Sequence, residues 1–156
     1  MTDDFHYTQG TAVKAFELED YYVWDCSVIK ANGNYHMFSS RWPKEMGFGW
    51  NWLFNAEVIH CVSDTPEGPY RFVNVVLPRR GRAYFDGMNT HNPSIHFYNG
   101  KYYLYYMGTT YGGDIPSHMD EISEPYFWET WNRKRIGVAV ADDIDSEFVR
   151  RDKPLL

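Results

Sequence analysis

The sequence contains one pattern twice, and this repetition constrains the fold more than any other feature. Ser27, Gly33 and Tyr35 recur as Ser94, Gly100 and Tyr102, each 67 positions later. A further pair of similar segments, 63–70 and 141–148, is 78 positions apart, so the second copy holds 11 additional residues. Repetition at a fixed spacing is typical of architectures in which each unit buries its apolar face against a neighbouring unit.

Each copy has the pattern of four short strands. We expect strands at 26–30, 35–39, 57–63 and 70–76 in the first copy, and at 94–97, 102–107, 135–141 and 148–151 in the second. Asn32-Gly33 and Asn99-Gly100 each supply a two-residue hairpin turn. A repeated four-stranded antiparallel meander fits a β-propeller blade better than a sandwich. The sequence therefore predicts an all-β fold with two propeller blades.

The repeat divides the chain into an N-terminal segment at 1–21, a first blade at 22–77 and a second blade at 78–156. The N-terminal segment lacks the blade pattern, and we expect it to supply an outer strand or to wrap an edge. Propellers close with four to eight blades, and two blades alone would expose apolar inter-blade faces. We therefore expect either further C-terminal blades in a longer protein or a homo-oligomer.

Both copies carry a long insertion. The first, at 42–55, is rich in Trp and Gly, and the second, at 111–132, is expected to contain one helical turn. Long insertions in compact blades tend to form functional rims.

Composition argues against several partners. The net charge of −6 gives no general attraction for nucleic acid or anionic membranes. No stretch reaches the roughly 20 apolar residues of a membrane span. The acidic N-terminus lacks a signal-peptide core, so we expect a cytoplasmic protein unless an export signal has been removed. We expect the basic cluster at 79–82 to be a solvated loop.

Motif spacing indicates neither a cofactor nor a metal. The sequence shows no Gly-rich phosphate loop, no Ser-His-Asp order and no Cys-His spacing of a metal site. Cys26 and Cys61 fall on strands that are not neighbours, so we expect two free thiols.

Several motifs together resemble the five-bladed β-propeller glycoside hydrolases, which are the family 43-like enzymes and relatives such as the fructan-cleaving and family 117 groups. They are Asp25 before Ser27-Val28-Ile29, the Gly33-Asn34-Tyr35 hairpin, Ser63-Asp64 with Gly68-Pro69-Tyr70, and Ile136-Gly137-Val138-Ala139. The resemblance extends from about residue 22 to residue 156. It implies a carbohydrate substrate, cleavage of glycosidic bonds in oligo- or polysaccharides, and a pocket at the propeller axis.

The resemblance also implies a role for Asp25. In such enzymes the first blade supplies an Asp that acts as general base or nucleophile, and Asp25 falls on that position, although Cys26 stands where the family often has Pro. The carboxylates of later blades, including the general acid, have no counterpart in two blades. The chain would therefore carry the base-side half of an active site. Alternatively, Asp25 caps the strand or pairs with an Arg.

Glycoside cleavage normally needs two carboxyl groups on opposite sides of the bond. Asp86 precedes the first strand of the second blade and could approach the same face as Asp25. Its alternative role is to form a turn before Gly87. Glu57 begins a third strand, where a surface position is expected.

Other residues are candidates for substrate contact. His91 and Asn92 are 67 positions after Trp24 and Asp25, and their side chains offer the directional hydrogen bonds that sugar hydroxyls need. Alternatively, they satisfy the backbone beside Pro93.

Aromatic residues and one arginine complete the candidate set. Four tryptophans fall near the first blade's loops: Trp24, Trp42, Trp50 and Trp52. Flat aromatic faces stack on sugars, and we assign Trp42 and Trp50 to the rim, with Trp24 a further substrate-contact candidate and core filling the alternative. Arg41 could bind a hydroxyl or carboxylate of the substrate, or instead pair with Glu45.

A function of another class also fits the repeat. Two-blade units could associate through their open faces as a non-catalytic carbohydrate-binding or assembly module. In either case we expect the chain alone to hydrolyse glycosides weakly or not at all.

Overall fold

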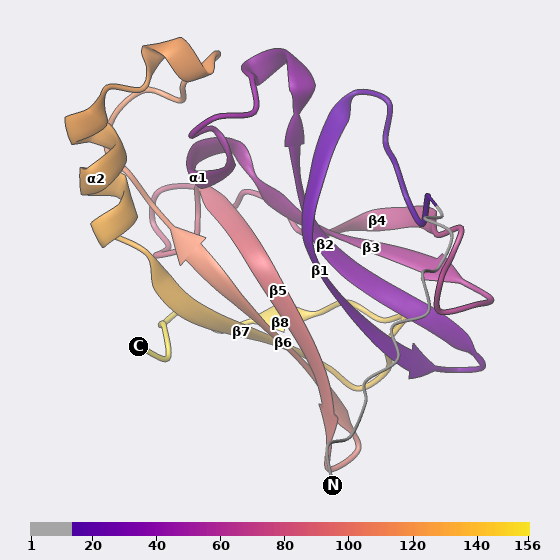
Figure 1. The fold of residues 1–156 in the computed structure, drawn as a ribbon. Helices are drawn as coiled ribbons and strands as arrows, with labels where there is room; N and C mark the ends of the chain where they lie inside the picture. The colour runs from indigo at the N-terminus through magenta and orange to yellow at the C-terminus, as the bar shows by residue number, and fades with distance from the viewer. Residues whose placement is uncertain (1–13) are drawn as a thin grey trace, which may run out of the picture.

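The computed structural model describes residues 14–156 and contains two four-stranded antiparallel sheets in the strand orders β1-β2-β3-β4 and β5-β6-β7-β8 (Figure 1). The first sheet consists of β1 (Tyr21–Ala31), β2 (Asn34–Pro43), β3 (Glu57–Ser63) and β4 (Arg71–Leu77). The second consists of β5 (Asn89–Tyr98), β6 (Lys101–Thr109), β7 (Arg135–Ala141) and β8 (Val149–Arg150). Each sheet is a meander with the topology of a propeller blade, as the repeat predicted.

Both hairpin turns have the expected geometry. Asn32 and Gly33 have φ angles of 50° and 84°, and Asn99 and Gly100 have φ angles of 48° and 77°. Two successive positive φ angles are the requirement of a type I′ turn, which Asn-Gly satisfies at low cost.

The first strand of each blade is longer than its apolar run, because each contains a β-bulge. Register shifts between Trp24 and Ser27 in β1, and between His91 and Ser94 in β5. Antiparallel pairing resumes before each bulge, so the strands begin five residues earlier than the apolar pattern indicated.

The bulges join the two blades. The backbone N–H of Asn92 donates to Ser40 Oγ at 2.9 Å, and the N–H of Ile95 donates to Ser27 Oγ at 3.1 Å. The first strands of the two blades, β1 and β5, therefore lie side by side.

A shared apolar core, which we call the inter-blade seam, fills the space between the two blades. Its buried members are Ala31, Phe38, Val58 and Leu77 from the first blade with Ile95, Leu104, Tyr106, Ala139, Ala141, Ile144 and Phe148 from the second. The Phe38 ring lies 4.7 Å from the His60 ring and 5.4 Å from the Phe148 ring. Neither blade could bury this face alone.

The opposite face of the first blade is covered by the N-terminal segment. Ala15, Phe16 and Leu18 pack against a buried cluster that includes Met37 and Cys61. Apart from a bridge between Leu18 and Tyr21, residues 14–20 form no strand and wrap the sheet. Residues 1–13 of the expected segment at 1–21 lie outside the described residues.

The opposite face of the second blade is more open. Tyr98 is 73% exposed on this face, and Tyr105 is also accessible. A cavity of about 470 Å³ on this face is lined by His96, Tyr98, Tyr103 and Tyr105.

The two insertions form short helices that contact each other at one end of the sheets (Figure 1). The first contains η1 (Lys44–Met46) and α1 (Trp52–Asn55), and the second contains η2 (Met119–Glu121) and α2 (Glu124–Asn132). The helix α2 is nine residues long, more than the single turn expected, because Ser123 accepts a hydrogen bond from the Tyr126 N–H as its N-cap. No helix among residues 14–156 is long and apolar enough to cross a bilayer.

The two cysteines are free, as expected. Cys26 is exposed in the β1 bulge, whereas Cys61 is buried and burial raises the pKa of its thiol to about 12.

The basic cluster at 79–82 is an exposed loop, as expected, and its three guanidinium groups also make hydrogen bonds within the chain. Arg79 donates to the carbonyls of Met88 and Phe54, Arg80 pairs with Asp86, and Arg82 donates to carbonyls of the second insertion. The three guanidinium groups tie the linker between the blades to both of them.

We expect Phe38→Ala to cost about 3–5 kcal/mol of unfolding free energy, because it opens a cavity in the inter-blade seam. Tyr98→Ala, on the open face, should cost less than about 1 kcal/mol. Urea unfolding followed by tryptophan fluorescence measures both. Equal losses in the two variants would show that the seam does not hold the blades together.

Candidate functional site

Asp25 lies in the β-bulge of β1, the strand that faces the neighbouring blade. Its φ angle of 51° is in the left-handed region, which Asp tolerates better than most residues. Its side chain is half-buried, and burial raises the pKa of the carboxyl group. No hydrogen bond or ion pair joins this carboxylate to another side chain within residues 14–156, so the alternative of a structural Arg partner has no support there.

A cavity of about 330 Å³ adjoins Asp25. It is lined by Lys14, Ala15, Phe16, Val23, Trp24, Asp25, Cys26, Met37 and Ser39. Ser39 Oγ donates to the Trp24 carbonyl at 2.8 Å and supports the bulge from β2. Asp25 is the one carboxylate among these lining residues.

Asn92 is the structural counterpart of Asp25 in the second blade. It has the same φ angle of 51°, lies in the equivalent bulge and is exposed. Its backbone N–H is bound by Ser40, which pairs with Trp24 across β1 and β2. The two bulges are therefore close neighbours across the seam.

His91 is buried beneath the site. Its side chain is 3% exposed, and its Nδ1 lies 3.0 Å from Asn89 Nδ2, which donates to it. Burial, together with the charge of Lys134, lowers the pKa of His91 to about 3. The imidazole is therefore neutral near pH 7, and the Trp52 ring packs against it edge to face at 5.1 Å.

Aromatic side chains from both insertions form one connected group with Trp24. We call this group the aromatic cluster, and its members are Trp24, Trp50, Trp52, Phe127, Trp128 and Trp131. Trp52 of α1 is its centre. Its ring lies 6.0 Å from Trp24 and 5.6 Å from Trp131, with edge-to-face geometry in both pairs. This arrangement joins β1, α1 and α2, and Trp24 belongs to both the cluster and the cavity.

Two tryptophans that we assigned to the rim lie in different environments. Trp50 is 39% exposed and stacks on Phe127 at 4.7 Å. Trp42 has no exposed surface, because Tyr22, Trp24 and Phe48 pack around it and its Nε1 donates to the Gly47 carbonyl. Trp42 therefore supports Trp24 from beneath and presents no face to a ligand.

Sequence reasoning missed the contribution of α2 and of Lys134, which lies two residues after its end. The Lys134 Nζ lies 3.0 Å from the Trp131 ring centroid and 5.7 Å from that of Trp52. Burial lowers the pKa of this amine. The spacing of Trp128 and Trp131, three residues apart in a segment with a Ser N-cap, was the available signal.

Arg41 lies away from the Asp25 cavity. Its Nε and Nη2 both donate to Glu57 Oε1, at 2.9 and 2.8 Å, and its guanidinium lies 4.1 Å from the Tyr21 ring. The partner is therefore Glu57 and not Glu45. These contacts give Arg41 a structural role between β1, β2 and β3.

Asp86 is the centre of a buried ionic network. It has no exposed surface, and its Oδ1 accepts from Arg80 Nε at 2.8 Å. Its Oδ2 accepts from the Tyr106 hydroxyl at 2.7 Å and from Arg150 Nη1 at 3.3 Å. The carboxylate links the start of the second blade to β6 and β8 and does not line the cavity at Asp25. Asp86 does lie in a turn before Gly87, whose N–H donates to the Tyr84 carbonyl at 3.2 Å, as the alternative predicted.

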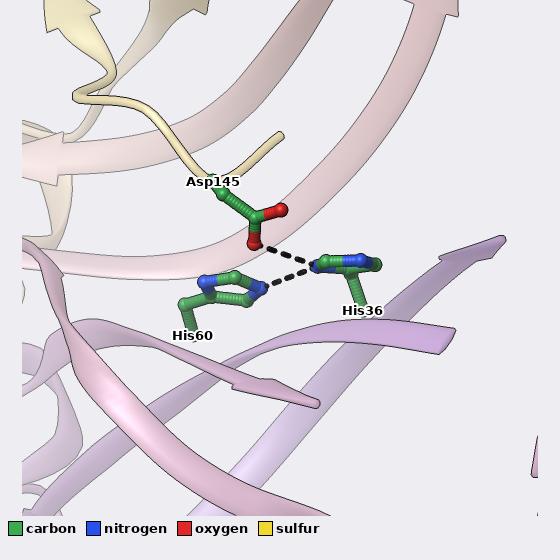
Figure 2. A group of neighbouring side chains, drawn as sticks. All are labelled: His36, His60 and Asp145. Atoms are coloured by element: carbon green, nitrogen blue, oxygen red, sulfur yellow. Dashed lines mark hydrogen bonds and ion pairs between the residues drawn. The ribbon is translucent and has the colours of Figure 1, made fainter. Parts of the chain in front are cut away.

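One group of side chains has the composition of a metal site. His36, His60 and Asp145 bring three donor atoms within 4.8 Å of one another (Figure 2). None of the three lines the cavity at Asp25.

Comparison with known proteins places the fold. No protein-family model and no curated protein matches the sequence. Solved structures that match include a GH43_1 enzyme from Xanthomonas citri, at 20% identity and a TM-score of 0.58, over 85% of this chain and 33% of that chain. A family 117 glycoside hydrolase from Zobellia galactanivorans matches at 19% identity and a TM-score of 0.64, over 90% of this chain and 42% of that chain.

A β-xylosidase matches at 22% identity and a TM-score of 0.59, over 87% of this chain and 37% of that chain. The fold is therefore that of propeller blades like those of family 43 and family 117 glycoside hydrolases. The chain spans between about a third and two fifths of the length of these structures.

We expect Asp86→Asn to cost about 3–5 kcal/mol of unfolding free energy, because it leaves Arg80 and Arg150 without their buried anion. Asp142→Asn is the matched control, since Asp142 pairs with Lys101 at the surface, and should cost about 1 kcal/mol or less. Chemical denaturation measures both. An Asp86→Asn variant as stable as the control would contradict the structural assignment.

The raised pKa of Asp25 predicts a pH-dependent effect of Asp25→Asn. Folding raises the pKa of the Asp25 carboxyl group, so the folded state binds the proton more tightly than the unfolded state does. Above the folded-state pKa, the ionised carboxylate therefore lowers the stability of the fold. The cost is absent where both states are protonated, below about pH 4. The variant should be more stable than the wild type at pH 7 and equally stable near pH 3.

Urea titrations at the two pH values test this, with Asp64→Asn at an exposed turn as the control. A loss of stability at pH 7 would mean instead that the Asp25 carboxylate has a stabilising partner.

Proposed function

We propose that this chain supplies the base-side half of a glycoside hydrolase active site, with Asp25 as the carboxylate that activates water or attacks the anomeric carbon. One observation carries the proposal. Asp25 is a half-buried carboxylate with a raised pKa, in the bulge of the strand that faces the next blade, and it lines a cavity beside an exposed tryptophan. A half-buried carboxylate with no side-chain partner among residues 14–156 costs stability, which is typical of functional groups.

The second carboxyl group must come from elsewhere. Glycosidases need an acid and a base or nucleophile roughly 5–9.5 Å apart on opposite sides of the bond. The described residues that line the Asp25 cavity include no second carboxylate. Because the chain spans less than half of its structural neighbours, we propose that further blades or another copy provide the acid.

The aromatic cluster is the proposed sugar platform. Trp24 is 45% exposed and borders Asp25, so a sugar stacked on its indole face would lie beside the carboxylate. A GH43_1 enzyme of the same fold was solved in complex with xylotriose, which makes xylo-oligosaccharides the first ligands to test.

We expect Trp24→Ala to weaken xylotriose binding by up to about tenfold, because a stacked aromatic pair contributes roughly 0.5–1.5 kcal/mol. Titration followed by NMR of the indole N–H signals measures this. Tyr98→Ala, on the open face of the second blade, should leave the affinity unchanged. If both variants bind like the wild type, the platform is elsewhere.

A measurement of glycoside hydrolysis tests directly whether this chain holds only half of an active site. We expect the purified 156-residue chain to turn over aryl xylosides and arabinofuranosides little or not at all, because the described residues that line the Asp25 cavity include no second carboxyl group. Robust turnover by this chain would show that the site is complete and would refute the half-site proposal.

The open face of the second blade favours a second candidate, a non-catalytic carbohydrate-binding or assembly module. Tyr98, Tyr103 and Tyr105 form an aromatic surface there, of the kind that soluble proteins usually cover. Light scattering distinguishes the two proposals. A discrete oligomer that binds sugar without hydrolysing it supports the second, whereas a monomer that binds sugar through Trp24 supports the first.

A further inference from the structure

We propose that His36, His60 and Asp145 form a binding site for a divalent transition metal, with Zn²⁺ the best match, that joins the two blades across the inter-blade seam. His36 is on β2 and His60 on β3, whereas Asp145 is on the loop between β7 and β8. Figure 2 shows the carboxylate directed at the two imidazoles from the opposite blade. This site is separate from the Asp25 cavity and does not depend on the proposed hydrolase function.

Three donor atoms converge at close range. His36 Nδ1 lies 2.9 Å from His60 Nε2 and 3.7 Å from Asp145 Oδ1. Ligands at the corners of a tetrahedral zinc site, with bonds of about 2.0–2.1 Å, are about 3.3 Å apart. Movements of a few tenths of an ångström, with Asp145 on an exposed loop, would bring the donors to that spacing.

When both imidazoles are neutral, the available protons do not satisfy this group. His36 Nε2 lies 3.2 Å from the Ala31 carbonyl and donates its proton there, so the neutral ring has an unprotonated Nδ1. That lone pair faces both His60 Nε2 and the Asp145 carboxylate. A proton on His60 Nε2 can be donated to His36 Nδ1. The Asp145 carboxylate then faces the lone pair of His36 Nδ1 with no proton between them. A cation held among the three atoms removes this repulsion.

Neighbouring groups hold the donors in place. The Ala31 carbonyl fixes the tautomer of His36, and Asn32 Nδ2 donates to Asp145 Oδ2 at 3.1 Å. The ring of His60 stacks on Phe38 at 4.7 Å with an angle of 5° between the planes. Carbonyl and amide partners of this kind orient the ligands of metal sites and raise their basicity.

The types of ligand atom in this group indicate which metal ion would bind. Two imidazoles and one carboxylate suit Zn²⁺, Co²⁺ or Ni²⁺, whereas Ca²⁺ needs six to eight oxygen ligands. A cavity of about 210 Å³ beside the group provides a path for the ion and room for a water as fourth ligand. Its polar lining includes His60, Asn74, Asp145 and Glu147.

Metal-stripped chain titrated with ZnCl₂ by calorimetry tests the proposal. We expect one ion per chain, a rise in the unfolding temperature, and visible d–d absorption bands when Co²⁺ replaces Zn²⁺. Asp145→Asn should weaken binding at least about tenfold, and His60→Gln should remove the Co²⁺ bands. His96→Gln, which changes an exposed histidine outside the group, should bind like the wild type.

Asp145 is exposed, so Asp145→Asn decides the question even if the buried His60 variant fails to fold. No metal binding by the wild type, or an Asp145→Asn variant whose affinity and Co²⁺ spectrum match the wild type, would overturn the proposal.

Discussion

The packing of one blade against the other positions every candidate site in this chain. Phe38, Val58 and Leu77 of the first blade share one buried core with Ile95, Leu104 and Ala139 of the second. The same contact sets the two bulges side by side, through the hydrogen bond from the Asn92 N–H to Ser40. It also brings Asp145 to the histidines of the first blade. Separating the blades would therefore disrupt both the aromatic cluster and the group formed by His36, His60 and Asp145.

The two ends of the seam have different chemistry. At the end where the insertions meet, Trp52 joins Trp24, His91 and Trp131, and buried charge is disfavoured, as the low pKa of His91 indicates. The cluster of His36, His60 and Asp145 has polar partners and an adjacent cavity. A carbohydrate would use the aromatic faces, whereas a metal would use the converging lone pairs.

Sequence patterns predicted the blades well because turn chemistry and strand periodicity are local. Asn32-Gly33 and Asn99-Gly100 identified both hairpins, and the 67-residue offset paired Asp25 with Asn92, which have the same backbone angle. The roles of Trp42 and Asp86 could not be predicted, because burial and ion pairing depend on residues far away in sequence. His36 and His60 are 24 positions apart on neighbouring strands, and only the other blade supplies their carboxylate.

Selective esterification of Asp25 is the most direct test that this carboxylate faces a sugar site. An epoxyalkyl xyloside would stack on the aromatic cluster, and a nearby carboxylate would attack the epoxide carbon, opening the ring to a hydroxy ester after protonation by water. Peptide mass spectrometry should find the ester at Asp25, suppressed by xylotriose and lost in Asp25→Asn. Equal labelling of Asp25 and of exposed carboxylates such as Asp64 and Asp120, unaffected by xylotriose, would contradict the account.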